Sequence, residues 1–476
     1  MSARPSQRNI KWVEGLRGIT SALVICTHIA RALDYPLFFP ADNENASPRL
    51  LQLPYLRIPN QGRIGVPIFA FLTGFVCAHK PLKLAYQQGN APAALKSIAR
   101  SAFRRPPRLA LPAVIATFIS FVLSCLGAYK AANHCDSFWV RFDAPDPLPL
   151  GPNIGRFFTT SITTWTNTEN LFDRHQWAMR PLLIGAFQVY IVLAATLGMR
   201  FQFRVLIHVL LIAYWWINGN ALTETFGAML ALGTLIAELS QHRPTQNFIA
   251  SRQRLLTFVV APIILLIGGF VGSYPQEHED WSPWSRALHR ILVEHNGRRG
   301  SIIVPSGTNA QRRTSAFFVA CTATSLFIAP IFQKLLSHRL LIWLGHHSFA
   351  VYLTHGTILR TVGIWIVYGI TGEPWQDAGK NEDGSPREQV WIKPKGRAHK
   401  MVAILVFTTL AYIAAWAWMK WVDTACARAT QWLENKVFDD DDGEGKSGLA
   451  EKGYAHVNGN GALPRPADAD RTQPPP

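Results

Sequence analysis

The sequence predicts an all-α protein, a polytopic bundle of about ten transmembrane helices with both termini in the cytoplasm. Of its 476 residues, 49% are hydrophobic and 16% are charged, against roughly 25% charged residues in soluble domains. The apolar residues also gather in long runs, such as 109–128 and 255–272. At about 1.5 Å per residue, a helix of that length crosses the roughly 30 Å hydrocarbon core of a bilayer. A soluble protein with several buried helices is the alternative, and the length of these runs disfavours it.

The hydrophobic runs predict the helices in chain order. They are expected at 15–33, 63–79, 109–128, 179–198, 205–217, 221–239, 255–272, 313–333, 345–370 and 401–421. The fifth of these runs is short for a span. The domain organisation that follows is a cytoplasmic segment over 1–14, one transmembrane domain over 15–421 and a disordered cytoplasmic tail over 434–476, rich in Gly, Pro and Ala.

Basic residues predict the orientation of the bundle, because cytoplasmic loops of membrane proteins collect Lys and Arg. The connection 80–108 is strongly basic, and the other even-numbered connections also carry arginine or lysine. Both termini are therefore expected in the cytoplasm. This topology accounts for the formal net charge of +17, so the expected partner is the lipid bilayer and no nucleic acid. The sequence does not distinguish the endoplasmic reticulum from the plasma membrane.

The first helix has a competing interpretation as a cleaved secretory signal. Basic residues within 4–11 precede an apolar stretch, and the small residues at 30–32 resemble a cleavage site. Cleavage would give no role to His28, which lies inside this stretch. We therefore favour a retained first helix.

No metal site or disulfide framework is predicted. The six cysteines are scattered without C-x-x-C spacing. The stretch "QEHEDWSPWSRALHR" (276–290) contains several metal-binding residue types, but they follow no recognised ligand spacing. A solvated loop is the better interpretation of that stretch.

Two histidines lie at matching depth inside predicted helices. His28 follows Arg17 by eleven residues, roughly 16 Å along a helix at about 1.5 Å per residue. In "LGHHSFAVYLTHG" (344–356), His355 shares one helix face with Tyr352 and Ser348. Ionisable residues are costly in a membrane, about 2.5 kcal/mol or more at a helix centre. Each histidine could simply bond a neighbouring helix, but two at one depth favour a neutral imidazole that takes a proton from a hydroxyl.

An arginine cluster precedes the third predicted helix. In "SAFRRPPRLALPA" (101–113), Arg105 and Arg108 form R-x-x-R, with Arg104 adjacent and a double proline between them. Guanidinium groups bind phosphate through two parallel hydrogen bonds, so a rigid cluster on the cytoplasmic side is a candidate phosphate site. Lysines would serve equally well if these residues only fixed the topology, so the three arginines favour phosphate binding.

These pieces together resemble the acyltransferase type 3 family of integral membrane acyltransferases. The resemblance rests on "GLRGITSALVICTH" (15–28), "GVPIFAFLTGF" (65–75), the R-x-x-R motif, "FGAMLALGTLIAEL" (226–239) and "LGHHSFAVYLTHG" (344–356). The motifs occur in the family's order, and the set is more specific than any one of them. The resemblance implies that 15–421 is an acyltransferase domain.

The resemblance implies transfer of an acyl group, often acetyl, from acyl-CoA to a hydroxyl of a polysaccharide, lipid or small metabolite. Acyl-CoA would be the donor substrate, with no bound cofactor. His28 would be the catalytic base, and His355 and Tyr352 would orient the acceptor or donate to the developing oxyanion. The donor would be bound by Arg17, Arg104, Arg105 and Arg108.

One departure from the family pattern concerns a carboxylate. The family often has a glutamate a few residues after a tryptophan in mid-chain, but no carboxylate follows Trp177 closely. Glu169 and Asp173 lie before it, so the carboxylate partner of the base is not identified by the sequence. A transporter with mid-membrane histidines and a non-catalytic protein on the same scaffold are the alternatives.

Overall fold

The computed structural model describes residues 10–87, 89–218, 225–294, 300–380 and 385–438, and these are mostly helical. The chain divides into two units, Met1–Gln431 and Trp432–Pro476. Most of the predicted N-terminal segment, 1–9, and most of the predicted tail, 439–476, lie outside the described residues. The candidate site lies within the first unit.

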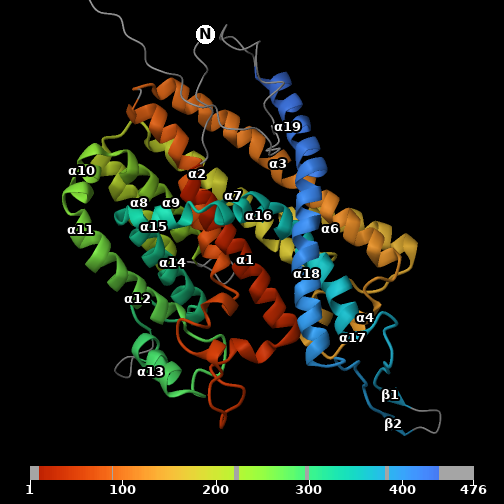
Figure 1. The fold of residues 1–476 in the computed structure, drawn as a ribbon. Helices are drawn as coiled ribbons and strands as arrows, with labels where there is room; N and C mark the ends of the chain where they lie inside the picture. Colours follow the sequence, from red (N-terminus) through yellow and green to blue (C-terminus); the bar gives the residue numbers. More distant parts are fainter. Residues whose placement is uncertain (1–9, 88, 219–224, 295–299, 381–384, 439–476) are drawn as a thin grey trace, which may run out of the picture. The chain divides into compact units, whose positions relative to one another are not determined.

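Helices form most of the described structure (Figure 1). The long helices are α1 (Lys11–Leu33), α2 (Gly65–Gln87), α3 (Ala91–Cys125), α6 (Leu150–Thr166), α7 (Met179–Thr196), α8 (Phe201–Asn218), α9 (Phe226–Gln241), α12 (Ala261–Gly272), α14 (Ala310–Ile328), α16 (Arg339–Ile358), α18 (Arg397–Trp418) and α19 (Thr424–Val437). Shorter helices are α4 (Lys130–His134), α5 (Phe138–Asp143), α10 (Arg243–Ser251), α11 (Gln253–Leu255), α13 (Pro283–Leu292), α15 (Pro330–Leu336) and α17 (Ile364–Tyr368). Single turns of 3₁₀ or π-helix are η1 (Tyr35–Phe38), η2 (Leu50–Gln52), η3 (Ile58–Asn60), η4 (Arg174–Ala178), η5 (Leu256–Val260), η7 (Leu359–Gly363) and η8 (Met419–Asp423). One two-residue hairpin pairs β1 (Gly379–Lys380) with β2 (Pro386–Arg387) in antiparallel fashion.

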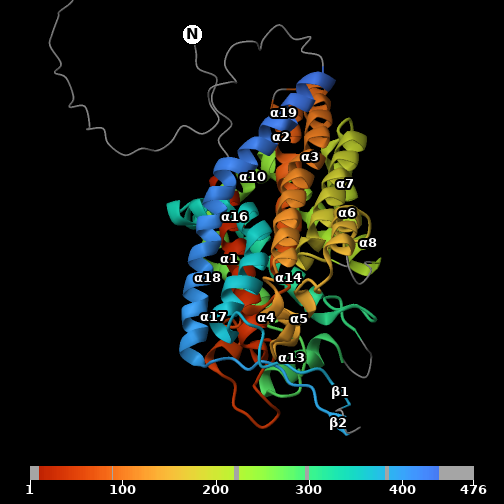
Figure 2. The ribbon, with the colours of Figure 1, turned by 90° about the vertical axis from the view of Figure 1, so that its right-hand side faces the viewer.

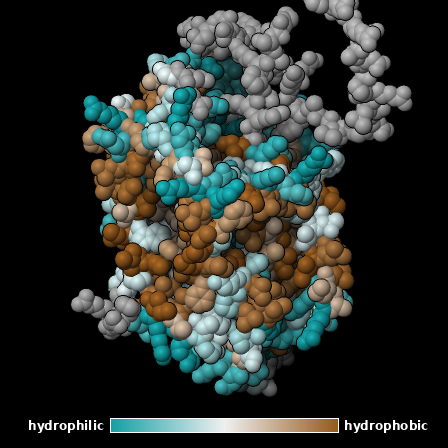
Figure 3. All heavy atoms as spheres, turned by 60° about the vertical axis from the view of Figure 1, so that its left-hand side comes forward, coloured by the Kyte–Doolittle hydropathy of each residue, from teal (hydrophilic) through white to brown (hydrophobic). Residues whose placement is uncertain are grey.

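The prediction of an all-α polytopic membrane protein is confirmed. Among the described residues, eight helices are long and apolar enough to cross a membrane, or nine if α14 and α15, bent by 105° at their junction, form one broken span. The shorter apolar helix α9 corresponds to the remaining predicted run. The face drawn in Figure 3 carries a broad hydrophobic band with hydrophilic residues above and below it, as a bilayer-embedded surface requires. The orientation of the bundle stays a prediction.

The third helix differs from the expected 109–128. α3 begins at Ala91, where the Asn90 side chain accepts a hydrogen bond from the Ala93 amide and caps the first turn. It then continues through Pro106 and Pro107, although each proline removes one backbone donor. The first part of the helix is held by packing on α2, with Ala94 and Ile98 buried. The arginine cluster is therefore helical and does not lie in a loop.

α1 and α16 approach so closely that glycine is required along the contact. A Cβ atom added at Gly18 would lie 2.3 Å from the Leu341 carbonyl oxygen of α16, and one at Gly15 would lie 1.7 Å from the carbonyl oxygen of Leu336, the last residue of α15. On α16, a Cβ at Gly345 would lie 2.0 Å from the Glu14 carbonyl oxygen. Small residues allow such backbone contact between membrane helices. This packing sets α16 against α1, with α17 and α18 alongside (Figures 1 and 2).

α2 and α9 form a second contact of this kind. A Cβ at Gly74 would lie 2.1 Å from the Leu230 carbonyl oxygen, and one at Gly233 would lie equally close to that of Phe71. Close packing against α9 therefore explains why the second helix carries a glycine at position 74. The two contacts, α1 with α16 and α2 with α9, are the most extensive helix contacts among the described residues.

The close contact at Gly345 predicts that Gly345→Ala destabilises the protein by about 1–3 kcal/mol, the usual range for overpacking. Thermal unfolding of the purified full-length protein in detergent measures this change. Gly155→Ala on α6 is the matched control, because its added Cβ meets nothing within 4 Å and alanine is the better helix former. Equal unfolding temperatures for the two variants would contradict the close contact.

Candidate active site

Three histidine side chains from separate elements converge inside the bundle. His28 comes from α1, His175 from η4 and His355 from α16. The ring centroids lie 4.2 Å apart for His28 and His175, 4.9 Å for His28 and His355, and 5.0 Å for His175 and His355. His175 and His355 are buried, and His28 is partly exposed. The sequence places these residues far apart, so only the packing of α1, η4 and α16 assembles them.

The hydrogen bonds of His355 determine which nitrogen of His28 can act as a base. The Nδ1 atom of His355 lies 3.0 Å from the Val351 carbonyl oxygen and 2.9 Å from that of Tyr352. Since carbonyl oxygens only accept, Nδ1 carries the proton and Nε2 is an acceptor. The His28 Nδ1–H group then donates to that Nε2 over 2.7 Å. Because the ring protons are assigned from these hydrogen-bond partners, the lone pair of the His28 ring lies on Nε2.

His175 has a different environment, because a carboxylate supports it. Its Nδ1–H donates to Oδ1 of Asp173 over 2.9 Å, and its Nε2 lies 3.5 Å from Oδ2 of Asp143. That Nε2 is buried and has no hydrogen-bond partner among the described residues. A buried acceptor without a hydrogen-bond partner costs free energy. Most buried polar atoms are therefore hydrogen-bonded, and one that is not often has a catalytic or binding role.

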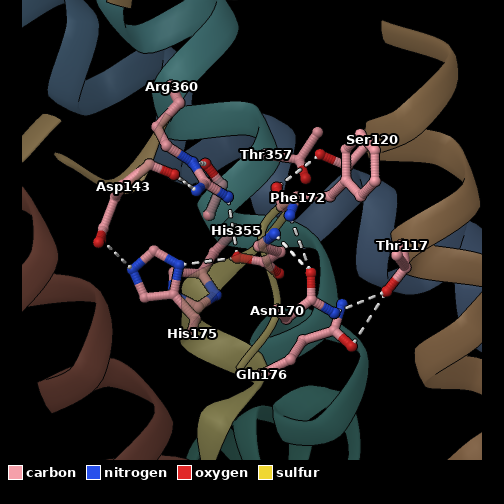
Figure 4. A network of polar contacts seen from close by, with 12 residues as sticks. Thr117, Ser120, Asp143, Asn170, Phe172, His175, Gln176, His355, Thr357 and Arg360 are labelled. Carbon is pink, nitrogen blue, oxygen red and sulfur yellow. Dashed lines mark hydrogen bonds and ion pairs between the residues drawn. The ribbon is translucent and has the colours of Figure 1, made fainter. Parts of the chain in front are cut away.

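Asp173 is held as a carboxylate by a buried arginine. Arg360 of η7 donates from an NH2 group to Oδ1 of Asp173 over 2.8 Å, and both side chains are at most 1% exposed. Arg360 also donates to the backbone carbonyls of Gly356 and Asp143, so each of its three nitrogens donates within the network (Figure 4). A buried ion pair of this kind is costly to break, because removal of one partner leaves the other charge desolvated.

The segment that carries His175 is irregular, and side chains satisfy its backbone. Oδ1 of Asn170 accepts from the amides of Phe172 and Asp173 over 3.0 and 2.8 Å. The Asn170 amide in turn donates to Thr117 of α3 over 2.9 Å, and Ser120 donates to the Phe172 carbonyl over 2.8 Å. Figure 4 shows how these contacts fix the segment between α3 and α16. Non-helical backbone inside a membrane protein requires such internal partners.

Gly356 allows the segment to lie against α16. A Cβ atom at this position would lie 2.5 Å from Nδ1 of His175 and 2.8 Å from Oδ1 of Asp173. Both atoms belong to the hydrogen-bonded pair, so any side chain here would displace it. The glycine that follows His355 in the sequence is therefore part of the site.

Comparison with known proteins identifies the chain. The model of a family described as an acyltransferase domain matches residues 10–376. The chain belongs to this family. It is a multi-pass membrane acyltransferase, which removes the alternative of a transporter.

Three fungal proteins are similar to this acyltransferase. O-acetyltransferase PaAT-1 of Phomopsis amygdali is 23% identical over 398 residues, which cover 76% of this chain and 74% of that protein. Acyltransferase R4 of a Phoma species is 21% identical over 76% of this chain and 86% of its own length. Acyltransferase clz18 of Cochliobolus lunatus is 21% identical over 74% of this chain and 83% of its own length. No solved structure matches significantly.

The structure brings some of the predicted site residues of the acyltransferase together and leaves others apart. His28 and His355 meet directly, as described above. The Tyr352 hydroxyl donates to the backbone carbonyl of His175, so it positions the third histidine. Arg17 pairs with Glu14 of its own helix over 3.3 Å.

The R-x-x-R residues of the acyltransferase lie on one helix of the bundle. Arg105 is half-buried, and its Nε has no hydrogen-bond partner within the described part of the chain. Arg104 and Arg105 both interact electrostatically with Tyr190 of α7. Arg108 is exposed and interacts electrostatically with Asp423 of η8. The cluster therefore lies where α3 approaches α7 and η8.

Sequence reasoning missed His175, Asp173 and Arg360. The available signal was the D-x-H spacing of "FDRHQW" (172–177), just before the tryptophan that the family pattern singles out. Asp173 was considered only as a partner for His28. The structure places it on His175, and Arg360 has no sequence signal because its partner lies far away in the chain.

The Asp173–Arg360 pair predicts that Asp173→Asn destabilises the protein by about 3–5 kcal/mol, because it leaves Arg360 buried and unpaired. Asp173→Asn combined with Arg360→Gln should recover part of this loss. Thermal or denaturant unfolding of the purified variants measures both changes. The exposed Lys130–Glu373 pair, 3.7 Å apart, provides the control, since Glu373→Gln should cost about 1 kcal/mol or less. A single Asp173→Asn variant as stable as wild type would contradict the buried pair.

Proposed function

We propose that this membrane acyltransferase moves an acyl group of acetyl size from acyl-CoA to a hydroxyl of a carbohydrate, lipid or small metabolite. The observation that carries the proposal is the His28 Nε2 lone pair, whose position is determined by the hydrogen bond to His355. A neutral imidazole with a fixed tautomer is suited to general-base catalysis on a hydroxyl. The printed name of the Phomopsis amygdali relative, an O-acetyltransferase, supports the same reaction class.

In the proposed reaction, Nε2 of His28 takes the proton of the acceptor hydroxyl. The oxygen attacks the thioester carbonyl, the new C–O bond forms and the C–S bond breaks. The CoA thiolate leaves and receives the proton from the imidazolium, which restores the neutral ring. The position of both reactants beside one ring supplies much of the rate, because the reaction becomes effectively unimolecular.

The other two histidines support this base. His355 holds the tautomer through its contact with His28. His175 lies beside His28 and is the one ring of the three whose hydrogen-bond partner is a carboxylate. A carboxylate stabilises an imidazolium, so the Asp173–His175 pair stabilises positive charge that develops in the centre during the transfer.

Arginine residues are proposed to bind the phosphates of the donor. Arg105 and Arg108 belong to α3, and Arg17 lies about 16 Å before His28 along α1, at about 1.5 Å per residue. An extended pantetheine arm spans such a distance. A phosphate bound at Arg17, in the N-terminal part of α1, would therefore place the thioester near His28. Guanidinium groups are suited to phosphate because their paired N–H groups match its oxygens.

The base assignment predicts that His28→Ala lowers acyl transfer by at least about 10²–10⁴-fold, the usual contribution of a general base. The assay measures free CoA released from acetyl-CoA in the presence of a panel of hydroxyl acceptors. His278→Ala is the control, because His278 stacks on Trp281 in a loop after α12. Turnover retained by His28→Ala would reject His28 as the base.

The donor assignment predicts that acetyl-CoA raises the unfolding temperature of the wild type. A ligand at about 100 times its dissociation constant adds roughly 2.7 kcal/mol to the stability of the folded state. The shift should disappear in Arg105→Ala/Arg108→Ala and persist in His28→Ala, which lacks only the base. Absence of a shift with acetyl-CoA and with longer acyl-CoAs would leave the arginines as topology signals.

A further inference from the structure

We infer that the three-histidine centre binds one late transition-metal dication, such as Zn²⁺, on Nδ1 of His28 and Nε2 of His175 and His355. No metal site was expected from the sequence. Among the described residues, these three side chains offer ligand atoms that all lie within 4.8 Å of one another. The binding part of this inference is independent of the proposed acyl transfer.

Two of the three nitrogens already face one another. Nδ1 of His28 and Nε2 of His355 are 2.7 Å apart, where they share a proton. Two nitrogens on one tetrahedral zinc, each about 2.0–2.1 Å from the metal, are about 3.3 Å apart. The pair must therefore open by roughly half an ångström, and the partly exposed His28 ring is the one free to move.

Outer hydrogen bonds prepare the other two rings as ligands. His175 donates its Nδ1–H to Asp173, and His355 donates its Nδ1–H to backbone carbonyls. Metal-binding histidines are oriented by such carboxylate and carbonyl partners. The Nε2 of His175 is buried and has no hydrogen-bond partner in the described part of the chain, so its lone pair is already desolvated and available.

The donor set determines the class of metal. Three neutral imidazoles are typical of zinc sites that keep one open position, and they also suit copper, nickel and cobalt. Magnesium and calcium require oxygen ligands. Asp143, whose Oδ2 lies 3.5 Å from Nε2 of His175, is the carboxylate placed to occupy the fourth position.

Metal binding would remove the base of the proposed reaction, and this consequence rests on the proposed function. A metal on Nδ1 of His28 displaces the proton shared with His355. The remaining ring proton must then reside on Nε2, because a neutral imidazole carries one proton. Nε2 becomes a donor and can no longer accept the proton of a hydroxyl, so Zn²⁺ should inhibit acyl transfer.

The test is a metal titration of the purified full-length protein after treatment with a chelator. Zn²⁺ binding is measured by calorimetry, and Co²⁺ binding by the visible absorption of tetrahedral cobalt. We expect one ion per chain, a rise in unfolding temperature with Zn²⁺ and no effect of Mg²⁺. His28→Ala and His175→Asn should each weaken Zn²⁺ binding by at least about tenfold. Loss of a residue that only hydrogen-bonds a metal ligand already costs about that much affinity, and loss of the ligand itself should cost no less.

A matched control separates this centre from a surface site. His289 lies 3.4 Å from Glu279 and 3.5 Å from Glu294, so it is the competing cluster. His289→Ala should keep the wild-type affinity. Absence of saturable binding, or binding that survives His28→Ala and is lost in His289→Ala, would overturn the inference. The unfolding transition of each variant reports whether it folds.

Inhibition is measured separately with the CoA-release assay. Chelator-treated enzyme should be active, and Zn²⁺ should abolish that activity at the concentration that saturates binding. Undiminished transfer by the zinc-loaded enzyme would overturn the inhibitory consequence. If no acyl transfer is found under any condition, the calorimetric and cobalt titrations still decide whether the metal site exists, so the two failures are distinguishable.

Discussion

The backbone contact between α1 and α16 is the constraint on which the rest of the site depends. At Gly18 and Gly345 there is no room for a Cβ atom, because carbonyl oxygens of the facing helix occupy its position, and the same holds at Gly15 against the end of α15. Packing in membranes gains little from the hydrophobic effect, so close van der Waals contact must hold such helices together. The same approach carries His28 to within 2.7 Å of His355.

The three histidines are chemically unequal because their partners differ. His355 donates to backbone carbonyls and accepts from His28, whereas His175 donates to a carboxylate that is paired with Arg360. Neutral partners determine a tautomer but do little to stabilise a cation, and a carboxylate does both. The buried Asp173–Arg360 pair is expensive to desolvate. The pair keeps Asp173 ionised beside His175, so that a carboxylate can accept the hydrogen bond of that ring.

The two proposed uses of this centre compete through the tautomer of His28, because the base needs the lone pair on Nε2 and the metal needs it on Nδ1. As the proposed base, His28 would accept the proton of an acceptor hydroxyl on Nε2. As ligands, the three imidazoles would accept a metal ion in place of the proton shared by His28 and His355. Both uses follow from neutral rings held at fixed orientation by buried partners, since ligation and base catalysis each require the unprotonated nitrogen. The partly exposed His28 is the ring through which either ligand would enter.

The sequence by itself determined the membrane bundle, the positions of most of its spans, and the two histidines of the first and ninth predicted helices. Apolar run length and the cost of ionisable residues in lipid are local properties, so they can be predicted from short stretches. The structure extended α3 through Pro106 and Pro107, because packing on α2 outweighs the two lost hydrogen bonds. Only the tertiary structure brought His175, Asp173 and Arg360 to the site, since these contacts join η4 to η7 and α16 across long separations in the chain. Such pairings depend on how helices pack, and no periodicity in the sequence encodes them.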